Sequence, residues 1–244
     1  MDEPRLRRIE KYPPPFKLNE FPKEVLLSIA KDLLLAKFMG ATDFRGDDWE
    51  KSFALAIGAT WKPSNVGLDD VVLHRTAWGA KTVKASKPFM QKSVRLISGR
   101  NSIDYSFGRS DSRQVPVQEI ASMVLGIWNR RVKDIRASYP NLRTAVLLKG
   151  NSLSEVAVFE FVTIEYEAEN YTWSWNKRNN LEGHDSQGNL VFTWQPHGVQ
   201  FTITHPVPVK RHCLRISLPA EIPFMNRDEV LEGIGFQSDW IEII

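Results

Sequence analysis

Cysteine is almost absent from this sequence: Cys213 is the one thiol among 244 residues. A single thiol excludes a disulfide framework within the chain and fits a reducing compartment. Its strand-like surroundings predict a small buried side chain. Long apolar runs are missing too, because residues 25–39 are interrupted by charges and are too short to span a membrane. No secretory signal follows the charged first residues, so we expect a soluble cytoplasmic protein without a membrane partner.

The motifs of several enzyme classes are also missing. The chain has no Gly-x-Ser-x-Gly elbow, phosphate-binding loop, dinucleotide fingerprint or His-Glu-x-x-His sequence. No second histidine stands at zinc-ligand spacing from His197, and His184, His205 and His212 are scattered. No repeat with a solenoid period is present. The sequence therefore lacks the signatures of serine hydrolases, of the common nucleotide-binding enzymes and of zinc hydrolases.

A net charge of only +3 conceals a strongly basic middle segment. Between Arg75 and Arg143 there are fourteen Lys or Arg residues and four Asp or Glu residues. Such a segment favours a nucleic-acid backbone as partner, since neutralising phosphates releases counterions. Within it, Arg95, Arg100 and Asn101 belong to a predicted strand and tight turn, where arginine can contact a phosphate or a guanine edge. The alternative is that these cations cover solvated helices or favour helix C-termini.

The order of the predicted elements favours an α/β protein. The predicted helices are 21–39, 50–57 and 116–139, and the predicted strands are 71–73, 80–83, 94–97 and 143–148. Asp47 or Asp48 is available as the N-cap of the second helix. A helix between strands indicates a central mixed sheet flanked by helices. Residues 1–20, charged and then proline-rich, are predicted to form an extended arm, and residues 21–244 a single domain.

The C-terminal third is rich in predicted strands. They lie at 157–166, continuing through 171–175, and at 190–194 and 199–204, with a helix at 228–231 and a terminal strand after them. Polar residues at the turns are suited to reading base edges, and the candidates are Lys177, Arg178, Gln195, His197 and Gln200. The alternative is that Trp173, Trp175 and Trp194 form the core and the polar residues are ordinary turn formers.

The stretch 49–84 carries the strongest chemical pattern. Glu50 lies on the predicted helix, Asp70 stands at the mouth of the strand 71–73, and Lys81 lies in the neighbouring strand. Mg²⁺ typically binds one or two carboxylates together with substrate phosphate. Such a metal generates a hydroxide, and a nearby ammonium stabilises the charged transition state. Each residue also has an ordinary structural explanation, as a turn former, an edge-strand residue or a favourable charge at a helix start.

At these residues the chain resembles the PD-(D/E)XK nuclease superfamily, and its type II restriction endonucleases in particular. In that family a helix supplies an acid, one strand supplies the Asp, and the next strand supplies an acid-x-Lys. Asp70 matches the Asp, Lys81 the Lys and Glu50 the helix acid. The chain departs from the pattern in two places: Gly79 stands where the second acid is expected, and Asp69 precedes Asp70 where the family has Pro. Glu50 is the obvious substitute for the missing acid.

The resemblance implies a restriction-endonuclease-like core, at about 21–150, and a β-rich recognition region, at about 151–244. It implies Mg²⁺-dependent, sequence-specific hydrolysis of double-stranded DNA that leaves 5′-phosphates. Asp70 and Glu50 would hold the metal and Lys81 would position the attacking water. A homodimer and a cognate DNA methyltransferase are further implied partners. Two alternatives stay open, namely a nuclease of the same superfamily with another role and a sequence-reading DNA-binding module without catalysis, which Gly79 favours.

Overall fold

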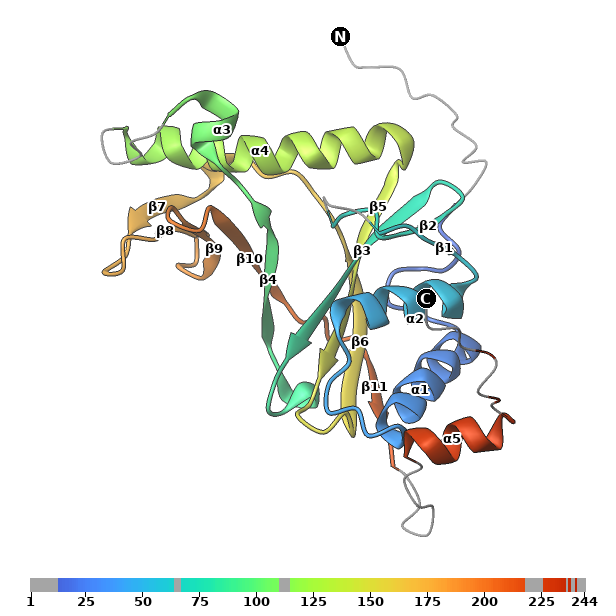
Figure 1. The fold of residues 1–244 in the computed structure, drawn as a ribbon. Helices are drawn as coiled ribbons and strands as arrows, with labels where there is room; N and C mark the ends of the chain where they lie inside the picture. Colours follow the sequence, from blue (N-terminus) through green and yellow to red (C-terminus); the bar gives the residue numbers. More distant parts are fainter. Residues whose placement is uncertain are drawn as a thin grey trace.

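Two β-sheets and one long helix above them form the frame of the molecule (Figure 1). The computed structural model describes residues 13–63, 67–109, 115–217, 226–235, 237 and 240. The helices are α1 (Lys23–Phe38), α2 (Gly46–Ile57), α3 (Ile103–Phe107), α4 (Val117–Ser138) and α5 (Arg227–Gly233). Short 3-10 turns lie at η1 (Pro88–Met90) and η3 (Ala168–Asn170). The predicted helices at 21–39 and 116–139 are confirmed as α1 and α4.

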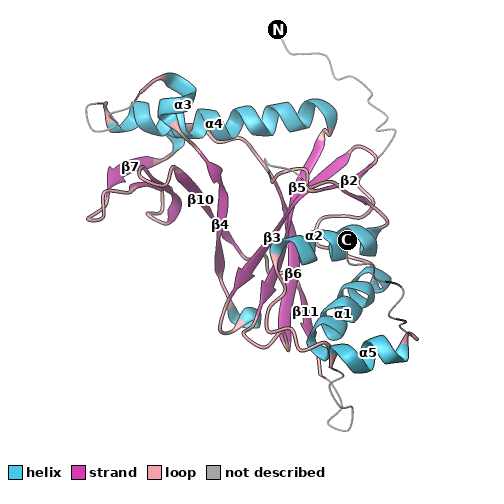
Figure 2. Cartoon of the chain, viewed as in Figure 1, coloured by secondary structure: helices cyan, strands magenta, loops and turns pink. Residues whose placement is uncertain are grey.

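The first sheet, called the central sheet below, is mixed. Its order is β1 (Thr60–Trp61), β2 (Val71–Leu73), β3 (Thr76–Lys84), β5 (Asn141–Lys149), β6 (Glu155–Val162) and β11 (His212–Arg215). Only the β3–β5 pair is parallel, because α4 carries the chain across between those strands. Helices α1 and α2 cover one face and α4 packs on the other (Figure 2). The predicted α/β class with a mixed sheet flanked by helices is confirmed.

The second sheet, called the outer sheet below, is antiparallel throughout. Its order is β4 (Ser93–Arg100), β10 (Gln200–Pro206), β9 (Leu190–Gln195), β8 (Leu181–His184) and β7 (Thr172–Trp175). The predicted strand 94–97 is confirmed within β4, which joins the outer sheet because β2 and β5 already pair with both edges of β3. Strands dominate the C-terminal part, as predicted, but β6 and β11 join the central sheet. Each sheet therefore contains strands from both halves of the chain.

The prediction of one continuous strand from 157 to 175 was wrong, because two separate strands, β6 and β7, lie in this region. Strand β6 stops at Val162, and the following backbone turns toward α4. The Trp128 indole N–H donates to the carbonyl of Ile164 at 2.9 Å, and the Asn129 amide donates to the carbonyl of Tyr166 at 2.8 Å. These bonds hold the crossing segment between the two sheets. Local alternation of residue types cannot reveal them, because both donors come from a distant helix.

Two local predictions need correction. Helix α2 begins at Gly46, earlier than expected, and its N-cap is Arg45, whose backbone N–H donates to the Asp48 carboxylate at 2.9 Å. Asp47 and Asp48 therefore lie in the first turn, where acids favour the helix dipole. Cys213 is exposed and not buried, since β11 is an edge strand of the central sheet. The helix expected at 228–231 is confirmed as α5, and the expected terminal strand lies outside the described residues.

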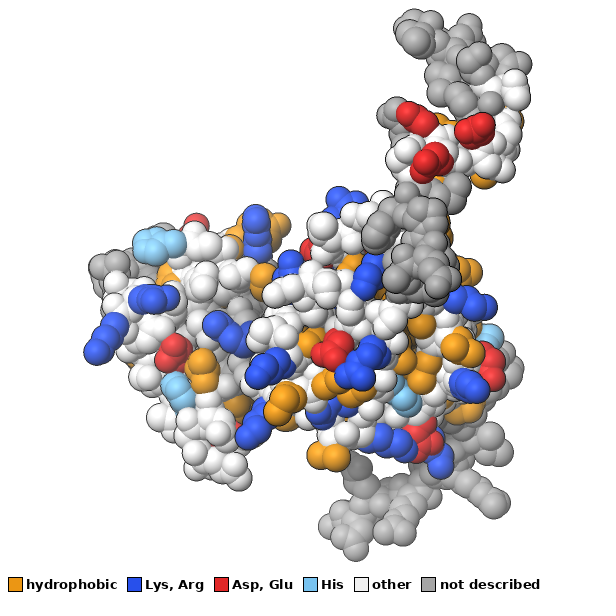
Figure 3. Space-filling model, turned by 90° about the horizontal axis from the view of Figure 1, so that it is seen from below, with side chains coloured by type: hydrophobic (Ala, Val, Ile, Leu, Met, Phe, Trp, Pro, Cys, Tyr) orange, Lys and Arg blue, Asp and Glu red, His pale blue; other side chains and the backbone are white. Residues whose placement is uncertain are grey.

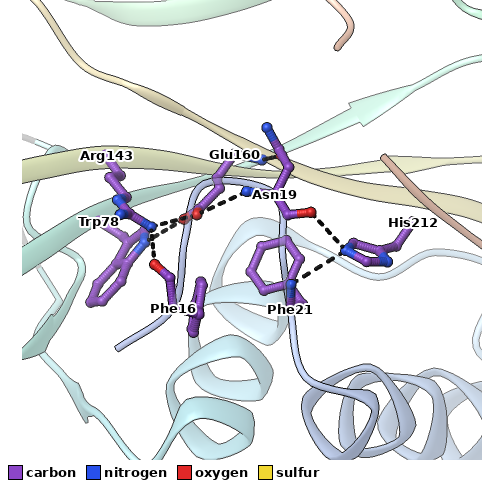
Figure 4. A network of polar contacts seen from close by, with 7 residues as sticks. All are labelled: Phe16, Asn19, Phe21, Trp78, Arg143, Glu160 and His212. Atoms are coloured by element: carbon purple, nitrogen blue, oxygen red, sulfur yellow. Dashed lines mark hydrogen bonds and ion pairs between the residues drawn. The ribbon is translucent and has the colours of Figure 1, made fainter. Parts of the chain in front are cut away.

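The described end of the predicted N-terminal arm is packed against the central sheet (Figure 4). The backbone N–H of Asn19 donates to Glu160 at 3.3 Å, and the backbone N–H of Glu160 donates to the Asn19 side chain at 2.7 Å. The Phe16 and Phe21 rings meet at 5.0 Å, and the Phe21 backbone N–H donates to His212 at 3.3 Å. Residues 16–21 thus belong to the folded body. No described helix has the length and apolar character needed to cross a membrane.

Candidate active site

Asp70 and Lys81 meet across the β2–β3 hairpin. The register pairs Val71 with Trp78, which sets Asp70 opposite the segment Gly79–Ala80. The Asp70 side chain is almost fully buried, and its Oδ2 accepts the Ala80 backbone N–H at 3.0 Å. The Lys81 Nζ lies 3.4 Å from the same oxygen, so neither contact uses Oδ1. The structure therefore brings together a carboxylate and an ammonium from neighbouring strands, as the sequence predicted.

Glu50 is directed to the same part of the molecule from helix α2. Its carboxylate accepts the Trp61 indole N–H at 3.0 Å, and Trp61 belongs to β1, the strand next to β2. The Glu50 charge is also one of the smaller causes that raise the pKa of Asp70, after burial. The sequence could not show this proximity, because it depends on how α2 packs over the sheet.

Burial dominates the electrostatics of Asp70. Loss of solvation raises the pKa of this carboxyl, and the Glu50 charge raises it further. The Lys81 ammonium and the Ala80 N–H oppose the shift without cancelling it. Two carboxylates with one nearby ammonium form a site that a divalent cation would stabilise by neutralising the excess negative charge.

These donors fit Mg²⁺ held jointly by protein and substrate. Among the described residues there is no group of three or more His, Cys, Asp or Glu side chains that could bind a metal. Mg²⁺ commonly uses one or two protein carboxylates and fills its other positions with water and substrate phosphate. Asp70 and Glu50 would supply that number of hard oxygen ligands, whereas a closed all-protein cage is not present in the described part of the chain.

The structure separates the two neighbouring aspartates. Asp69 is also buried, but its Oδ2 lies 2.6 Å from the Nζ of Lys62. The side chain of Asp69 is therefore directed to an ion pair of its own, while that of Asp70 is directed to Lys81. Successive side chains in an extended segment point to opposite sides. This alternation predicts that Asp69 and Asp70 point apart, but it does not show which of them faces Lys81.

Gly79 has a steric reason to lack the acid found in the family pattern. A Cβ atom at this position would lie 2.7 Å from the carbonyl oxygen of Gly67 and 3.2 Å from Cα of Leu68. The backbone that leads into Asp70 thus occupies the volume an acidic side chain would need. A second carboxylate for a metal would therefore have to come from another element, and Glu50 of α2 is the candidate because its charge acts on Asp70.

Replacing Gly79 by alanine is expected to destabilise the protein by about 1–3 kcal/mol, because the new methyl group meets rigid backbone. Urea unfolding measures the loss. Gly126 is a matched control in α4, since a Cβ there would find its nearest neighbour, Phe107, at 3.9 Å. Alanine at position 126 should be neutral or stabilising by up to about 1 kcal/mol. Equal stability of the two variants would contradict the steric explanation.

Lys81 also lines a small cavity between the sheets. Its volume is about 150 Å³, and its wall includes Gly67, Thr144, His205 and the segment Ile97–Gly99. A space of this size holds a few water molecules, given about 30 Å³ for each. The His205 ring stacks on Phe161 with centroids 3.9 Å apart, and burial lowers the pKa of His205 to about 4. His205 is therefore neutral near pH 7, and sequence reasoning gave no signal that it lines the same cavity as Lys81.

Asn101 differs from the other residues expected to contact DNA. It is fully buried, its amide donates to the carbonyl of Val124 at 2.8 Å, and its Oδ1 accepts from Arg131 at 2.9 Å. Asn101 is thus a packing residue that ties the end of β4 to α4. Arg131, which also donates to the carbonyl of Arg100, fills the space beside Gly99.

The remaining DNA-contact candidates lie at the surface. Arg95, Arg100, Lys177, Arg178 and His197 are exposed, and Gln195 and Gln200 are half-buried. Gln200 pairs in register with both Arg100 and Gln195, so these three side chains share one face of the outer sheet. Trp173 and Trp194 are buried on the opposite face, which agrees with their core alternative.

Part of the basic segment is structural. Arg143 is buried with its Nη1 2.6 Å from Glu160, and Arg136 donates to the carbonyl of Thr163 at 2.6 Å. Burial lowers the pKa of Arg131, which is enclosed between α4 and β4. The cations of the segment therefore divide into a group inside the fold and a group at the surface. Sequence composition counts both groups alike.

No protein-family model, curated protein or solved structure matches this chain. The geometry of its own residues must carry the functional assignment.

Replacing Asp70 by asparagine is expected to stabilise the metal-free protein near neutral pH. The folded-state pKa is raised, so the ionised carboxylate opposes folding above that pKa, and this cost disappears as the pH falls through it. Mg²⁺ should reverse the ranking, since a ligand of the folded state stabilises only the chain that binds it. Melting temperatures with and without Mg²⁺ measure both effects. A Mg²⁺-induced increase of the same size in both proteins would remove Asp70 from the metal site.

Proposed function

We propose that this chain is a Mg²⁺-dependent type II restriction endonuclease that hydrolyses double-stranded DNA at a specific sequence. The observation that carries the proposal is the meeting of Asp70 and Lys81 across adjacent strands, 3.4 Å apart, with Glu50 in electrostatic reach. A buried carboxylate with a raised pKa beside an ammonium and a second acid is typical of functional sites rather than of surface ion pairs.

The arrangement of elements supports a restriction-endonuclease-like core. Helix α2 supplies Glu50, the entry to β2 supplies Asp70, and β3 supplies Lys81. This is the order of helix acid, strand Asp and strand Lys that the resemblance to the PD-(D/E)XK nucleases implies. The Gly79 position departs from that family, and the close approach of Gly67 explains why an acid is absent there.

The proposed chemistry is an in-line attack of water on phosphorus. Bound Mg²⁺ would supply charge neutralisation and a lowered pKa for coordinated water. Asp70 and Glu50 would hold the cation, and Lys81 would orient the attacking water and offset the negative charge that develops on the phosphate oxygens. The new P–O bond would form to the water oxygen, which gives up a proton to solvent, as the bond from phosphorus to the 3′-oxygen breaks and that oxygen takes up a proton. The products are a 5′-phosphate and a 3′-hydroxyl.

The partners belong to the same proposal. Duplex DNA is the substrate, and a homodimer would let each subunit cut one strand of a twofold-symmetric site. A cognate methyltransferase would protect host DNA. These statements are analogies with the family and depend on the nuclease assignment.

A plasmid digest with Mg²⁺ tests the function directly. Discrete bands support restriction, and sequencing their ends would give the recognition site and the position of each cut. A smear would indicate a nuclease of the same superfamily with another role. Intact plasmid together with a gel shift would indicate a DNA-binding module without catalysis, the alternative that the absence of an acid at Gly79 favours. A digest repeated in EDTA separates metal-dependent cleavage from contamination by a metal-independent nuclease.

A further inference from the structure

The outer sheet has one apolar and one polar face. Phe192, Trp194 and Phe201 on one face pack against α4 and are fully or almost fully buried. The register places Gln195, Gln200 and Arg100 together on the other face, with Arg95 opposite Thr204. This polar face therefore presents rows of hydrogen-bonding side chains from three adjacent strands, β4, β10 and β9.

A pocket on the polar face gathers several of these residues. It has a volume of about 410 Å³, and its lining includes Arg95, Gln195, Lys177 and Arg178. We call it the basic pocket. Arg95 comes from β4 and Gln195 from β9, whereas Lys177 and Arg178 come from the turn between β7 and β8. Residues about eighty positions apart in the sequence thus converge on one concave surface.

The cations of the basic pocket lack anionic partners in the described part of the chain. No carboxylate lies within 4.0 Å of the charged groups of Arg95, Lys177 or Arg178 there. The pocket does contain Glu182, but its Oε1 accepts the Asn176 amide at 2.6 Å. Like charges gathered in one concavity repel each other, so an anionic ligand would stabilise this arrangement. Figure 3 shows Lys and Arg side chains spread over the face seen there, with fewer carboxylates among them.

The turn that carries Lys177 and Arg178 is preorganised. The Asn176 side-chain oxygen accepts the backbone N–H groups of Arg178 at 2.9 Å and Asn180 at 3.0 Å. The Asn176 backbone N–H donates to the carbonyl of Asn180 at 2.9 Å, which closes the turn. Asn179 adopts a left-handed conformation with φ 58°, a geometry that asparagine tolerates well. Binding therefore need not order this segment, which lowers the entropic cost.

Strand β4 connects the basic pocket with the candidate active site. Arg95 lines the basic pocket, and Ile97–Gly99 of the same strand line the cavity beside Lys81. The register turns Arg95 to the polar face of the outer sheet and Leu96 to the face that borders the cavity, so the two sites lie on opposite faces of the same strand.

We propose that the basic pocket reads base edges in the major groove of duplex DNA and that Arg95 is a specificity-determining residue. The choice of duplex DNA rests on the proposed function. Arg95 and Gln195 project from strands, whose fixed backbone suits the bidentate bonds that arginine forms with guanine and glutamine with adenine. Lys177 and Arg178 project from a turn and contact phosphates, which position the duplex without reading it.

The experiment selects duplexes from a random-sequence pool with the wild-type chain in EDTA, so that binding is measured without metal-dependent cleavage. The bound pool should be enriched in one motif that contains guanine. Arg95→Ala should lose the preference at one position by roughly 5- to 150-fold, the range expected for one bidentate pair. Arg95→Lys keeps the positive charge but lacks the planar guanidinium group that forms two parallel hydrogen bonds, so it should fail to restore the preference for guanine.

Two comparisons separate base reading from general attraction. Lys177→Ala should weaken binding to all sequences alike and reduce the slope of log affinity against log salt by about one. Lys31→Ala, on the exposed side of α1, should change neither quantity. An unchanged motif in Arg95→Ala, its rescue by Arg95→Lys, or tighter binding of single-stranded RNA than of duplex DNA would overturn the proposal.

The outcomes also distinguish this inference from the proposed function. Discrete plasmid bands with an unaltered motif in Arg95→Ala would overturn the role of Arg95 and leave the nuclease assignment in place. An Arg95-dependent motif in a protein that cuts no plasmid would support base reading and remove the catalytic assignment. Binding without any enriched motif would overturn the inference whatever the plasmid digest shows.

Discussion

The Lys81→Ala variant is expected to bind DNA normally and to lose cleavage by at least about 10²–10³-fold, the size typical of removing one group that stabilises transition-state charge. The Lys81 Nζ lies 3.4 Å from the Asp70 carboxylate and at the wall of the cavity beside it. In the proposed mechanism this ammonium orients a water next to a metal that Asp70 would hold. Cleavage rates and gel shifts on the same DNA measure the two effects separately.

Lys62 supplies a matched control for that experiment. Its Nζ lies 2.6 Å from Asp69, the residue directly before Asp70, so it forms the neighbouring ion pair. The Lys62 side chain is 51% exposed, compared with 25% for Lys81. Lys62→Ala should retain cleavage, since its ammonium belongs to a pair separate from the proposed metal site. Normal cutting by Lys81→Ala, or equal loss in both variants, would show that the catalytic assignment of Lys81 is wrong.

Arg143→Leu is expected to destabilise the protein by about 3–5 kcal/mol, the cost of leaving a buried charge without its partner. Glu160 is 0% exposed, and its carboxylate accepts from Arg143 at 2.6 Å and from the Trp78 indole at 2.9 Å. The same guanidinium donates to the carbonyl of Phe16 at 3.1 Å, which helps to hold the N-terminal segment on the sheet (Figure 4). Urea unfolding at neutral pH measures the loss.

The pH dependence of the Arg143→Leu variant identifies the cause. Burial raises the pKa of Glu160 even in the intact protein, and Arg143 is the main group that opposes the shift. Without Arg143 the ionised carboxyl opposes folding above its folded-state pKa, and this cost is relieved as the pH falls through that pKa. The variant should therefore recover stability relative to wild type as the pH is lowered from neutral.

Two further proteins complete the comparison. Arg143→Leu combined with Glu160→Leu should be more stable than Arg143→Leu alone, because no unpaired charge remains. The pair Arg215–Glu155 is the matched surface case, with an N–O distance of 2.9 Å and side chains 69% and 38% exposed. Arg215→Leu should cost no more than about 1 kcal/mol. A pH-independent loss in Arg143→Leu would contradict the buried-charge explanation.

The local elements of this fold were accessible from the sequence. Apolar periodicity located α1 and α4 within a few residues, and short alternating runs located β2, β9 and β10. The closeness of Asp70 and Lys81 was also predictable, since a tight hairpin brings neighbouring strands together whatever the rest of the chain does. The sequence predicted less well which sheet each strand joins. The residue pattern of β4 predicts a strand, but its pairing partner β10 lies about a hundred residues away, and local patterns do not reveal such a distant partner.

The sequence by itself determined which residue types are available: a pair of adjacent acids, a lysine in the next strand, and a basic segment with few acids. These follow from local periodicity and composition, which depend on residues near one another in the chain. Tertiary structure alone decided that the Glu50 carboxylate accepts from Trp61 beside β2, that Asn101 and Arg143 are enclosed, and that the Gly67 backbone fills the volume beside Gly79. Such contacts join elements that are distant in the chain, so they form only when those elements pack together and cannot be inferred from neighbouring residues.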